Sequence, residues 1–480
     1  MQSSLQDYVS DNTYLGPPGD GSFSGAAGGA ACGDLARISP LIEDGRIVSI
    51  TFDAEGCAAT RAACACLCEM ADGKTVLEVA GIGPDEIESE LGGLSPARRH
   101  AVVLTADALH RALSSAASSG IKLADENPER VLVAVSGGVD SAVAALRERE
   151  RGAEVVAVTV KLWADPDTDG AKACCSPEAV LGARAVTHSL GIPHFTLDLE
   201  DQFREKVVGE FVKGYGEGVT PNPCILCNGE VRIAAMVDLA DRLGATHLVT
   251  GHYARIVEDD EGCLLAAGHD TNKDQSYMLA ALPPEVISRL SFPLAEITKT
   301  QVREIAERNS LSVAKKPESQ DLCFLAGQNK RDFLERHGGL TERGGDVVDR
   351  TGKSLGRHGG HHNFTVGQRR GLGVAAGHPL YVIGTDSKTN TVTVGDREAL
   401  SVDRVSVRNA VMHRDGAVVD RVRLRYRSEP VRAKVAAGAG RHASLELELD
   451  EPFYGPAPGQ AAVLMSGDTV VGHATITRNR

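Results

Sequence analysis

A glycine-containing turn with the sequence Ser136-Gly137-Gly138-Val139-Asp140-Ser141 follows an apolar run at 131–135 and precedes an alanine-rich helical pattern. Paired glycines let a backbone curl until its N–H groups point at an anion, and the start of the next helix adds further donors. An ordinary strand-to-helix turn is the alternative interpretation. The complete string in this context predicts a phosphate-binding loop, although the Gly-Lys-Ser/Thr of a Walker loop is missing. Asp140 and Ser141 could orient magnesium or a phosphate oxygen.

The segments around this loop alternate between apolar runs and helical patterns. Runs at 155–160, 195–197 and 247–251 are separated by helical patterns at 177–190 and 230–243. This rhythm is typical of parallel α/β units, so we predict an α/β domain with a parallel sheet.

The remainder of the chain differs in pattern. After about Gly327 the helical periodicity fades and alternating valines predict two β-rich domains. Since 480 residues exceed one compact core, composition shifts suggest four domains. We place them at residues 1–125, 128–328, 329–403 and 404–480.

Bulk properties restrict the cellular setting. The net charge is −14, yet an arginine-rich stretch at 421–427 includes Tyr426. On charge alone, this stretch fits nucleic-acid contact and a solvated edge strand equally well. The 11 cysteines, without an export signal or a membrane-length apolar run, favour thiolate chemistry or metal binding in a reducing compartment. We therefore expect a soluble, cytoplasmic protein with no membrane partner.

Three cysteines carry the most specific chemistry. Cys224 and Cys227 lie three positions apart after a proline-containing turn, and Cys323 follows far downstream. A Cys-x-x-Cys pair alone is ambiguous between zinc, redox and cluster roles. Three thiolates on a cubane iron–sulfur cluster would leave one iron open to an exogenous sulfide.

Several motifs together resemble the tRNA-specific 2-thiouridylases, which belong to the N-type ATP pyrophosphatases. The resemblance covers about residues 128 to 480 and rests on the phosphate loop, on Asn222 to Asn228, on Thr250 to Tyr253, on Asn272 to Tyr277 and on Gly367 to Gly373. It implies a PP-loop ATP pyrophosphatase domain at 128–328, a central β-rich tRNA-contacting domain at 329–403 and a C-terminal β-barrel at 404–480.

The resemblance also implies site residues. ATP contacts are implied for Ala134, Val135, Ser136, Gly137, Gly138, Val139, Asp140, Ser141, Val160 and Gly251. Contacts with tRNA are implied for Asn222, Pro223, His252, Lys273, Asp274, Gln275, Arg425, Tyr426 and Gln460, with Asn222 to Cys224 facing the target base. Cys227 matches the family nucleophile and Cys323 its persulfide carrier. Many members have aspartate at the position of Cys224, and its presence is similar to the branch in which three cysteines hold a 4Fe–4S cluster.

The N-terminal segment resembles U-type iron–sulfur scaffold proteins over about residues 5 to 115. Cys32, Asp34 and Cys57 match the family pattern, and His100 is present, but Ala101 replaces the third cysteine. These four ligand candidates could bind zinc or a labile cluster in an α+β domain. Cys64, Cys66 and Cys68 lie in a helical pattern, where buried small side chains are the favoured interpretation.

These motifs predict a tRNA-uridine 2-sulfurtransferase that adenylylates O2 of uridine 34 in the anticodon stem-loop with ATP and Mg²⁺, and then transfers sulfur to C2. The sulfur would come from a donor such as a cysteine desulfurase or a sulfur relay protein. The rival hypothesis is an iron–sulfur assembly or storage protein with a nucleotide-regulated domain. Turnover of ATP to AMP that depends on tRNA would separate the two.

Overall fold

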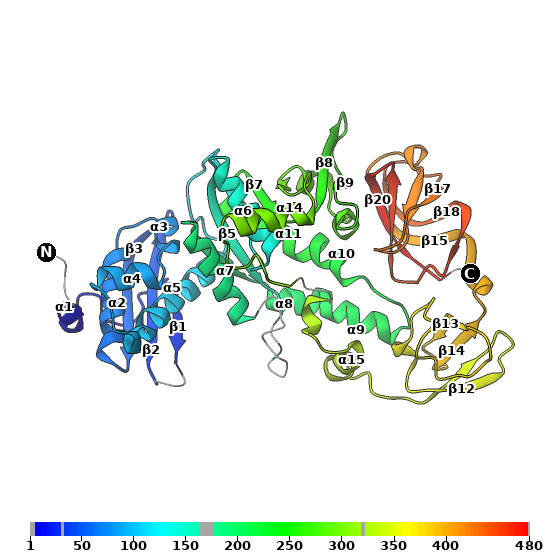
Figure 1. Cartoon of the computed structure of the whole chain (residues 1–480), viewed down its shortest axis with the longest axis horizontal. Helices are drawn as coiled ribbons and strands as arrows, with labels where there is room; N and C mark the ends of the chain where they lie inside the picture. Colours follow the sequence, from blue (N-terminus) through cyan, green and yellow to red (C-terminus); the bar gives the residue numbers. More distant parts are fainter. Residues whose placement is uncertain (1–4, 30–32, 164, 166–175, 318–321, 479–480) are drawn as a thin grey trace.

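The computed structural model describes residues 5–29, 33–163, 165, 176–317 and 322–478. Four structural parts follow one another along the chain (Figure 1): an N-terminal α+β part, a parallel-sheet part and two β parts. The predicted fold class is confirmed for each of them. Within the described ranges, no helix is both long and apolar enough to cross a membrane.

The N-terminal part contains an antiparallel sheet of β1 (Gly25–Gly28), β2 (Leu35–Glu43) and β3 (Arg46–Glu55). Helices α2 (Ala58–Ala71) and α5 (His100–Ser118) pack on it. Only a glycine fits at Gly25, because a Cβ there would lie 2.2 Å from the Ala108 carbonyl oxygen of α5. The shorter helices are α1 (Leu5–Ser10), α3 (Val76–Ala80), α4 (Pro84–Glu90) and the 3₁₀ turn Pro96–Arg98.

The second part is built on a parallel sheet with the strand order β10-β7-β4-β5-β6. Its strands are β4 (Arg130–Ala134), β5 (Glu154–Lys161), β6 (His194–Asp198), β7 (His247–Thr250) and β10 (Leu290–Ser291). The larger helices are α6 (Val139–Glu150), α7 (Pro177–Ser189), α9 (Gly209–Gly216), α11 (Ile233–Arg242), α14 (Lys299–Arg308) and α15 (Lys330–Gly338). Shorter turns are α8 (Glu200–Phe203), α10 (Pro223–Cys227), α12 (Ser276–Leu279), α13 (Pro284–Ile287) and the π-helical turns Arg204–Val208 and Asn228–Arg232.

The third part is a four-stranded sheet of β11 (Gly345–Val348), β12 (Ser354–His358), β13 (Tyr381–Asp386) and β14 (Thr391–Gly395). The fourth is a barrel closed by pairing between its first and last strands. Its strands are β15 (Ser401–Met412), β16 (Arg421–Arg423), β17 (Val431–Lys434), β18 (Gly440–Tyr454), β19 (Ala461–Ser466) and β20 (Thr469–Ile476).

A hairpin of the parallel-sheet part extends the barrel sheet. It consists of β8 (Ala254–Asp259) and β9 (Gly262–Ala267), and β9 pairs with β20 through Ala266↔Thr469 and Leu265↔Val470. The guanidinium of Arg414 adds a bidentate contact with Asp259. This shared sheet fixes the barrel beside the segment that follows β7.

The N-terminal part is docked firmly on the edge of the parallel sheet. Helix α5 packs against the edge strand β6. Arg184 of α7 forms an ion pair with Asp107 of α5 at 3.3 Å, and the rings of His110 and His188 lie 5.3 Å apart. In the connection between the two parts, the side chain of Leu123 is fully buried and its N–H donates to the Arg242 carbonyl.

Candidate functional site

The phosphate loop has the predicted backbone shape. Gly137 has a φ of 71°, which allows the chain to turn between β4 and α6. The N–H of Ser136 donates to Ser141 Oγ at 3.1 Å, and this hydroxyl donates to the Gly138 carbonyl at 3.1 Å. These contacts hold the loop in shape, and the first turn of α6 adds unpaired N–H groups beside it.

Four other predicted ATP-binding positions lie beside the loop. Ala134 ends β4, and the N–H of Val135 donates to the Val158 carbonyl of β5 at 2.8 Å. Val160 lies near the end of β5, and Gly251 follows β7. A Cβ on Gly251 would lie 2.9 Å from the Asp140 carbonyl carbon and the Ser141 nitrogen. Gly251 is therefore required for the close approach of β7 to the loop.

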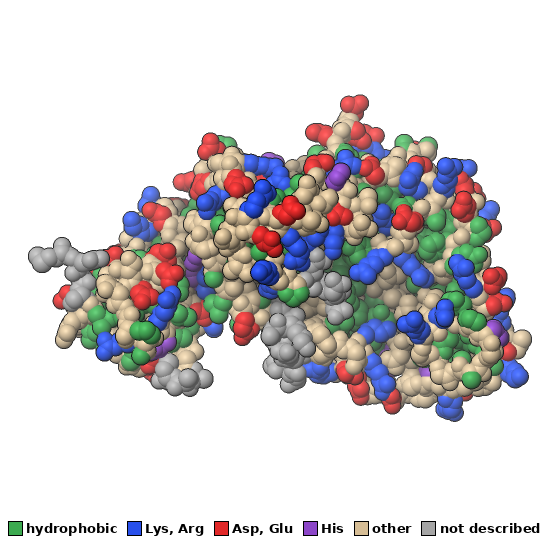
Figure 2. All heavy atoms as spheres, viewed as in Figure 1, with side chains coloured by type: hydrophobic (Ala, Val, Ile, Leu, Met, Phe, Trp, Pro, Cys, Tyr) green, Lys and Arg blue, Asp and Glu red, His purple; other side chains and the backbone are tan. Residues whose placement is uncertain are grey.

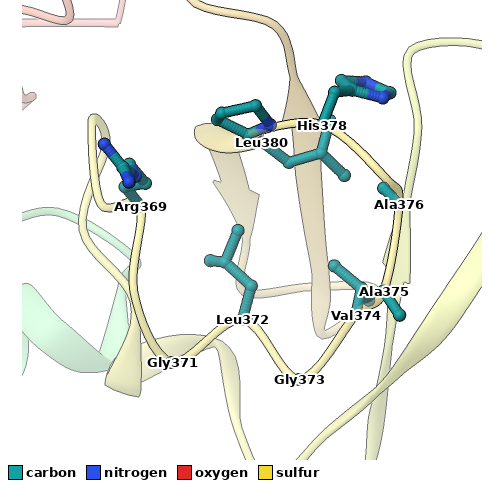
Figure 3. A pocket seen from close by; sticks show the side chains of 10 residues that line it. Arg369, Gly371, Leu372, Gly373, Val374, Ala375, Ala376, His378 and Leu380 are labelled. Atoms are coloured by element: carbon teal, nitrogen blue, oxygen red, sulfur yellow. The ribbon is translucent and has the colours of Figure 1, made fainter.

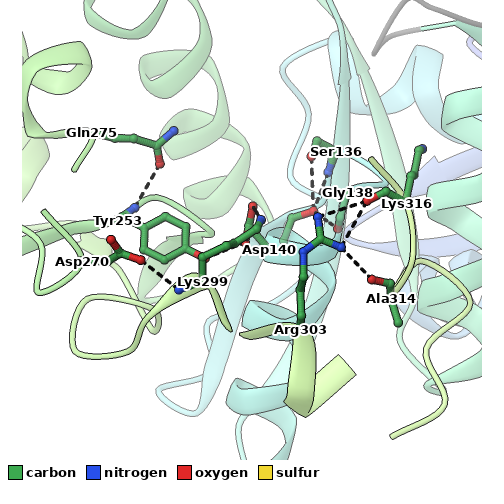
Figure 4. Close-up of polar contacts among 11 residues, drawn as sticks. Ser136, Gly138, Asp140, Tyr253, Asp270, Gln275, Lys299, Arg303, Ala314 and Lys316 are labelled. Carbon is green, nitrogen blue, oxygen red and sulfur yellow. Dashed lines mark hydrogen bonds and ion pairs between the residues drawn. The ribbon is translucent and has the colours of Figure 1, made fainter. Parts of the chain in front are cut away.

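Two lysines that the sequence analysis did not identify reach this loop (Figure 4). Lys299 Nζ lies 2.7 and 2.6 Å from the two carboxylate oxygens of Asp140, which also accepts a bond from the Tyr253 hydroxyl at 2.7 Å. Lys316 Nζ donates to the Gly137 carbonyl at 3.0 Å. The loop thus has cations although its own sequence contains none.

Cys224 and Cys227 lie on the short helix α10. Asn222 caps this helix by accepting from the Ile225 N–H at 3.3 Å, and Pro223 occupies its first position. The spacing of three residues places both thiols on one face. Cys227 is 7% exposed. Burial and then Cys227 raise the pKa of the Cys224 thiol to about 11, while the nearby Arg232 opposes this shift.

Cys323 begins a 3₁₀ turn, Cys323–Leu325, that packs beside an aromatic cluster. Phe324 is buried against Phe211 and Phe333, with ring centroids 5.1 Å away in each case. Among the described residues, the sulfur atoms of Cys224, Cys227 and Cys323 do not form a group of three ligand atoms within 4.8 Å of one another. These cysteines are therefore not arranged around one mononuclear ion, whose tetrahedral thiolates lie about 4 Å apart. A cluster spreads its thiolates over different irons.

His252 forms two hydrogen bonds beside the end of β7. Arg232 donates to its Nε2 at 3.0 Å, and its Nδ1 lies 2.7 Å from the Thr250 hydroxyl. Burial and the Arg232 charge lower the pKa of His252 to about 3. The ring is therefore a neutral histidine that orients Arg232. Both ring nitrogens therefore have partners within the protein, and the tRNA contact implied for His252 stays a prediction.

Asp274 is a buried residue that braces its turn, and its predicted contact with tRNA stays a prediction. Its carboxylate accepts from Arg423 of β16 at 2.7 Å and from the Ser276 N–H at 3.1 Å. Only 4% of the Asp274 side chain is exposed. Its neighbour Gln275 accepts from the Tyr253 N–H at 3.0 Å, while Lys273 lies on the same turn.

The predicted barrel residues lie around α10. Gln460 Nε2 donates to the carbonyls of Thr220 and Pro221 at 2.8 and 3.2 Å, which supports the segment before Asn222. The ring of Tyr426 lies 5.9 Å from that of Tyr277. Arg425 donates to the carbonyls of Val366 and Gly455, so it also links the third part to the barrel. The barrel therefore helps to position α10.

Figure 2 shows Lys and Arg side chains around the hollow between the parallel-sheet part and the two β parts. A separate hollow of about 510 Å³ lies in the third part and is lined by residues of the 369–380 segment (Figure 3). It contains Arg369 and His378 and belongs to the Gly367 to Gly373 motif and its continuation. It does not include the phosphate loop or the cysteines.

The N-terminal part has a compact group of potential metal ligands. Asp34, Cys57 and His100 bring their ligand atoms within 4.8 Å of one another. His100 Nε2 lies 3.0 Å from Asp34 Oδ2, and Thr60 donates to the same oxygen at 2.6 Å. These bonds, led by that of Thr60, lower the pKa of Asp34 to about 2. Cys32 lies outside the described residues.

Two further sequence predictions for this part can be compared with the structure. Ala101 is fully buried at the start of α5, so it contributes neither a donor atom nor an exposed position to the group. Cys64, Cys66 and Cys68 are completely buried in α2, which confirms the interpretation as small core residues.

The fold and the site define a PP-loop nucleotide-binding protein with an N-terminal scaffold-like domain. Residues 4–119 match the NifU-like N terminal domain, 129–327 the tRNA methyl transferase HUP domain, 331–396 the tRNA methyl transferase PRC-barrel domain and 399–476 the aminomethyltransferase beta-barrel domain. The chain is 44% identical over 476 residues to the bifunctional protein NifU/MnmA of Rubrobacter xylanophilus, with 96% of each chain covered. It therefore belongs to the family of bifunctional NifU/MnmA proteins.

Relatives without the N-terminal domain are also similar. The tRNA-specific 2-thiouridylases MnmA of Sorangium cellulosum and Syntrophotalea carbinolica are each 43% identical, covering 72% of this chain and 92% and 98% of theirs. Both resemblances noted in the sequence are confirmed.

Proposed function

We propose that this protein is a tRNA-uridine 2-sulfurtransferase that converts uridine 34 of the anticodon to 2-thiouridine. Its similarity to the NifU/MnmA protein along nearly the whole chain carries this proposal. The phosphate loop and the cysteine helix supply the two halves of the chemistry, activation by ATP and delivery of sulfur. The products are 2-thiouridine, AMP and pyrophosphate.

The uridine must leave its stack before the enzyme can reach C2, since a base within a stem-loop hides its reacting atom. Asn222, Pro223 and Cys224 face the extruded base, and ATP lies on the Ser136 to Ser141 loop. O2 attacks the α-phosphorus of ATP, and pyrophosphate leaves. The adenylylated O2 is then a good leaving group, so that a sulfur nucleophile forms the C2–S bond while AMP departs with the oxygen.

The three cysteines suit a 4Fe–4S cluster. Cys224 and Cys227 share a helix face, and all three thiols are at least partly buried. Such a cluster would supply an iron without a protein ligand, to which sulfide can bind. Because burial raises the pKa of Cys224 to about 11, the thiol needs a cation to become a ligand, and Arg232 provides part of that charge. In the alternative scheme, Cys323 carries a persulfide and Cys227 is the nucleophile.

The tRNA and the sulfur donor are the expected partners. We assign Lys273, Arg425, Tyr426 and Gln460 to the anticodon stem-loop. Gln460 supports this by binding the segment before α10. Cationic side chains hold phosphates and set the position of the RNA without reading its sequence. A cysteine desulfurase or a sulfur relay protein would supply the sulfur. Asp140 is the candidate magnesium ligand of the ATP site.

A second function, cluster assembly or storage, is favoured by the Asp34, Cys57 and His100 group. Its mixed oxygen, sulfur and nitrogen donors suit zinc or a labile cluster, with Cys32 as a fourth candidate ligand. Both ring nitrogens of His100 face oxygen acceptors, and these bonds, above all the one with Asp34, raise the pKa of His100. A metal ion would therefore have to displace a proton from this ring.

Anaerobic thiolation of unmodified tRNA with ATP, magnesium and sulfide tests the main proposal. AMP and 2-thiouridine should form together and only with tRNA. Cys224→Ala should abolish product and the iron of the α10 cluster, whereas Cys263→Ala, a change at a partly exposed cysteine of β9, should leave both unchanged. Product without iron in the Cys224 variant would favour the persulfide scheme. No tRNA-dependent AMP from the wild type would favour the assembly function.

A further inference from the structure

The phosphate loop of this protein has no lysine of its own. In a Walker loop the lysine neighbours the phosphates it binds. Here the corresponding string reads Ser-Gly-Gly-Val-Asp-Ser, and its one charged side chain, Asp140, repels a phosphate unless a cation lies between them. A pyrophosphate leaving group gathers negative charge as it departs, so that a site of this kind needs cations close to the loop.

Lys299 meets this need from the first turn of α14. Lys299 is 9% exposed, and its amine contacts both carboxylate oxygens of Asp140. The capping box of Thr298 and Gln301 fixes the start of α14, and the Lys299 N–H donates to Asp270 at 3.0 Å. The ammonium group is therefore held beside the loop by its own helix. It cancels the Asp140 charge where an anion would enter.

Lys316 approaches the other end of the loop. Its amine donates to the carbonyl of Gly137, which is the loop residue with a left-handed backbone conformation. The segment that carries it is anchored, because Arg303 of α14 donates to the Ala314 carbonyl at 3.0 Å. Lys316 is an exposed residue, so that its amine can move onto an incoming ligand without breaking a buried contact.

We propose that Lys299 and Lys316 form a clamp that binds the β- and γ-phosphates of ATP and then the pyrophosphate product. This inference rests on the proposed use of ATP and adds the residues that stabilise its leaving group. One helix, α14, positions both amines: directly for Lys299 and through Arg303 for Lys316. Figure 4 shows Lys299 beside Asp140 and shows Arg303 linked to the carbonyls of Ala314 and Lys316.

Calorimetric titration of the full chain with inorganic pyrophosphate, without magnesium, tests the clamp. Lys316→Met removes one charge-assisted bond, so its affinity for pyrophosphate should be about 10- to 100-fold lower than that of the wild type. Its affinity for AMP should be unchanged. Lys315→Met is the matched control, because Lys315 is the exposed neighbour in the same segment. It should bind pyrophosphate as the wild type does.

The role of Lys299 needs a paired substitution, since Lys299→Met leaves the Asp140 charge without its partner. If Lys299 binds phosphate, Lys299→Met with Asp140→Asn stays at least 10-fold weaker for pyrophosphate than Asp140→Asn alone. Equal affinities would show that the lysine only neutralises Asp140 and would overturn its half of the clamp. Wild-type affinity in Lys316→Met would overturn the other half.

These outcomes remain distinct from a failure of the proposed function. If the wild type makes AMP and 2-thiouridine but Lys316→Met binds pyrophosphate normally, the clamp is wrong and the sulfurtransferase stands. If the wild type binds neither ATP nor pyrophosphate, both proposals are wrong.

Discussion

The ion pair between Asp274 and Arg423 joins the turn after β9 to barrel strand β16 and permits a quantitative prediction. Asp274 and Arg423 have side-chain exposures of 4% and 15%, with an N–O distance of 2.7 Å. The same carboxylate also accepts from the N–H groups of Gly268 and Ser276 at 3.3 and 3.1 Å. Asp274→Ala would leave a buried guanidinium without its carboxylate and free two backbone donors.

Removing one member of a buried, hydrogen-bonded pair costs about 3 to 5 kcal/mol. Each 1.4 kcal/mol is about a factor of ten in an equilibrium constant, so the local opening of this turn should rise by about two to three and a half orders of magnitude. The exposed pair of Asp420, which precedes β16, and Arg421, which begins it, has side-chain exposures of 49% and 42% and is the matched control. Asp420→Ala should cost at most about 1 kcal/mol.

Hydrogen exchange followed by mass spectrometry measures this opening in peptides that cover Gly268 to Ser276. Asp274→Ala should accelerate exchange there by about 100-fold or more, and Asp420→Ala by less than about tenfold. Binding of tRNA should weaken in Asp274→Ala together with this loosening, whereas Lys273→Ala should weaken it without loosening. If Asp274→Ala weakens tRNA binding while exchange stays at the wild-type rate, the bracing role is refuted and Asp274 contacts the RNA.

Three further predictions follow from the site. The pKa of His252 is about 3 in the folded protein and about 6.5 in the unfolded chain, so its contribution to stability is complete above pH 6.5 and falls as the pH drops toward 3. In calorimetry, the stability of His252→Gln should therefore fall less steeply with acid than that of the wild type. In iron-free protein, alkylation of Cys224 should be slow at pH 8 and rise toward pH 11, and Arg232→Met should slow it further, as peptide mass spectrometry would detect. Phe324→Ala should cost about 3 to 5 kcal/mol and shift the emission of Trp163, the single tryptophan, to longer wavelength.

Local patterns in the sequence were sufficient for the main sheet. Parallel strands are buried on both faces, so that 131–135, 155–160 and 195–197 are mainly apolar, while 247–251 is a strand-like run. Strand β10 has only two residues, Leu290–Ser291, and therefore gives no periodic signal. The β8–β9 hairpin was missed for another reason. Its partner β20 lies at the far end of the chain, and pairing between such distant segments leaves no local pattern.

The same distinction applies to the site. The loop at Ser136 to Ser141 is a local motif, and the structure shows the turn that its paired glycines predict. Lys299 and Lys316 reach the loop only through tertiary packing, with no spacing rule that links them to it. Asp274 lies in a motif that the resemblance assigns to RNA, and no local pattern indicates its burial against Arg423. Its contact with tRNA stays a prediction beside this bracing role.

The docking of the N-terminal domain changes how its fusion should be interpreted. A flexible tether would raise the effective concentration of one domain at the other. Here the connection is short and Leu123 is buried, while Arg184 and His188 of α7 contact α5 and the turn at Ala80. Leu123 and α5 hold the domain on the sheet edge. Figure 1 shows the N-terminal part and α10 on opposite sides of the parallel-sheet part, so a cluster or sulfur atom held at Asp34 would have to be released, or passed on by a partner, to reach α10.

This geometry also selects the experiment for supply. Truncation before Glu126 would remove α5 and expose β6 and α7, including His194, which is fully buried. Loss of activity in the truncated protein would then report instability as well as lost supply. Cys57→Ser keeps the docked surface and changes one ligand candidate of the N-terminal group. If thiolation under limiting iron and sulfide is unchanged in Cys57→Ser, the N-terminal group does not feed the catalytic site; a decrease that excess iron and sulfide restore would support supply.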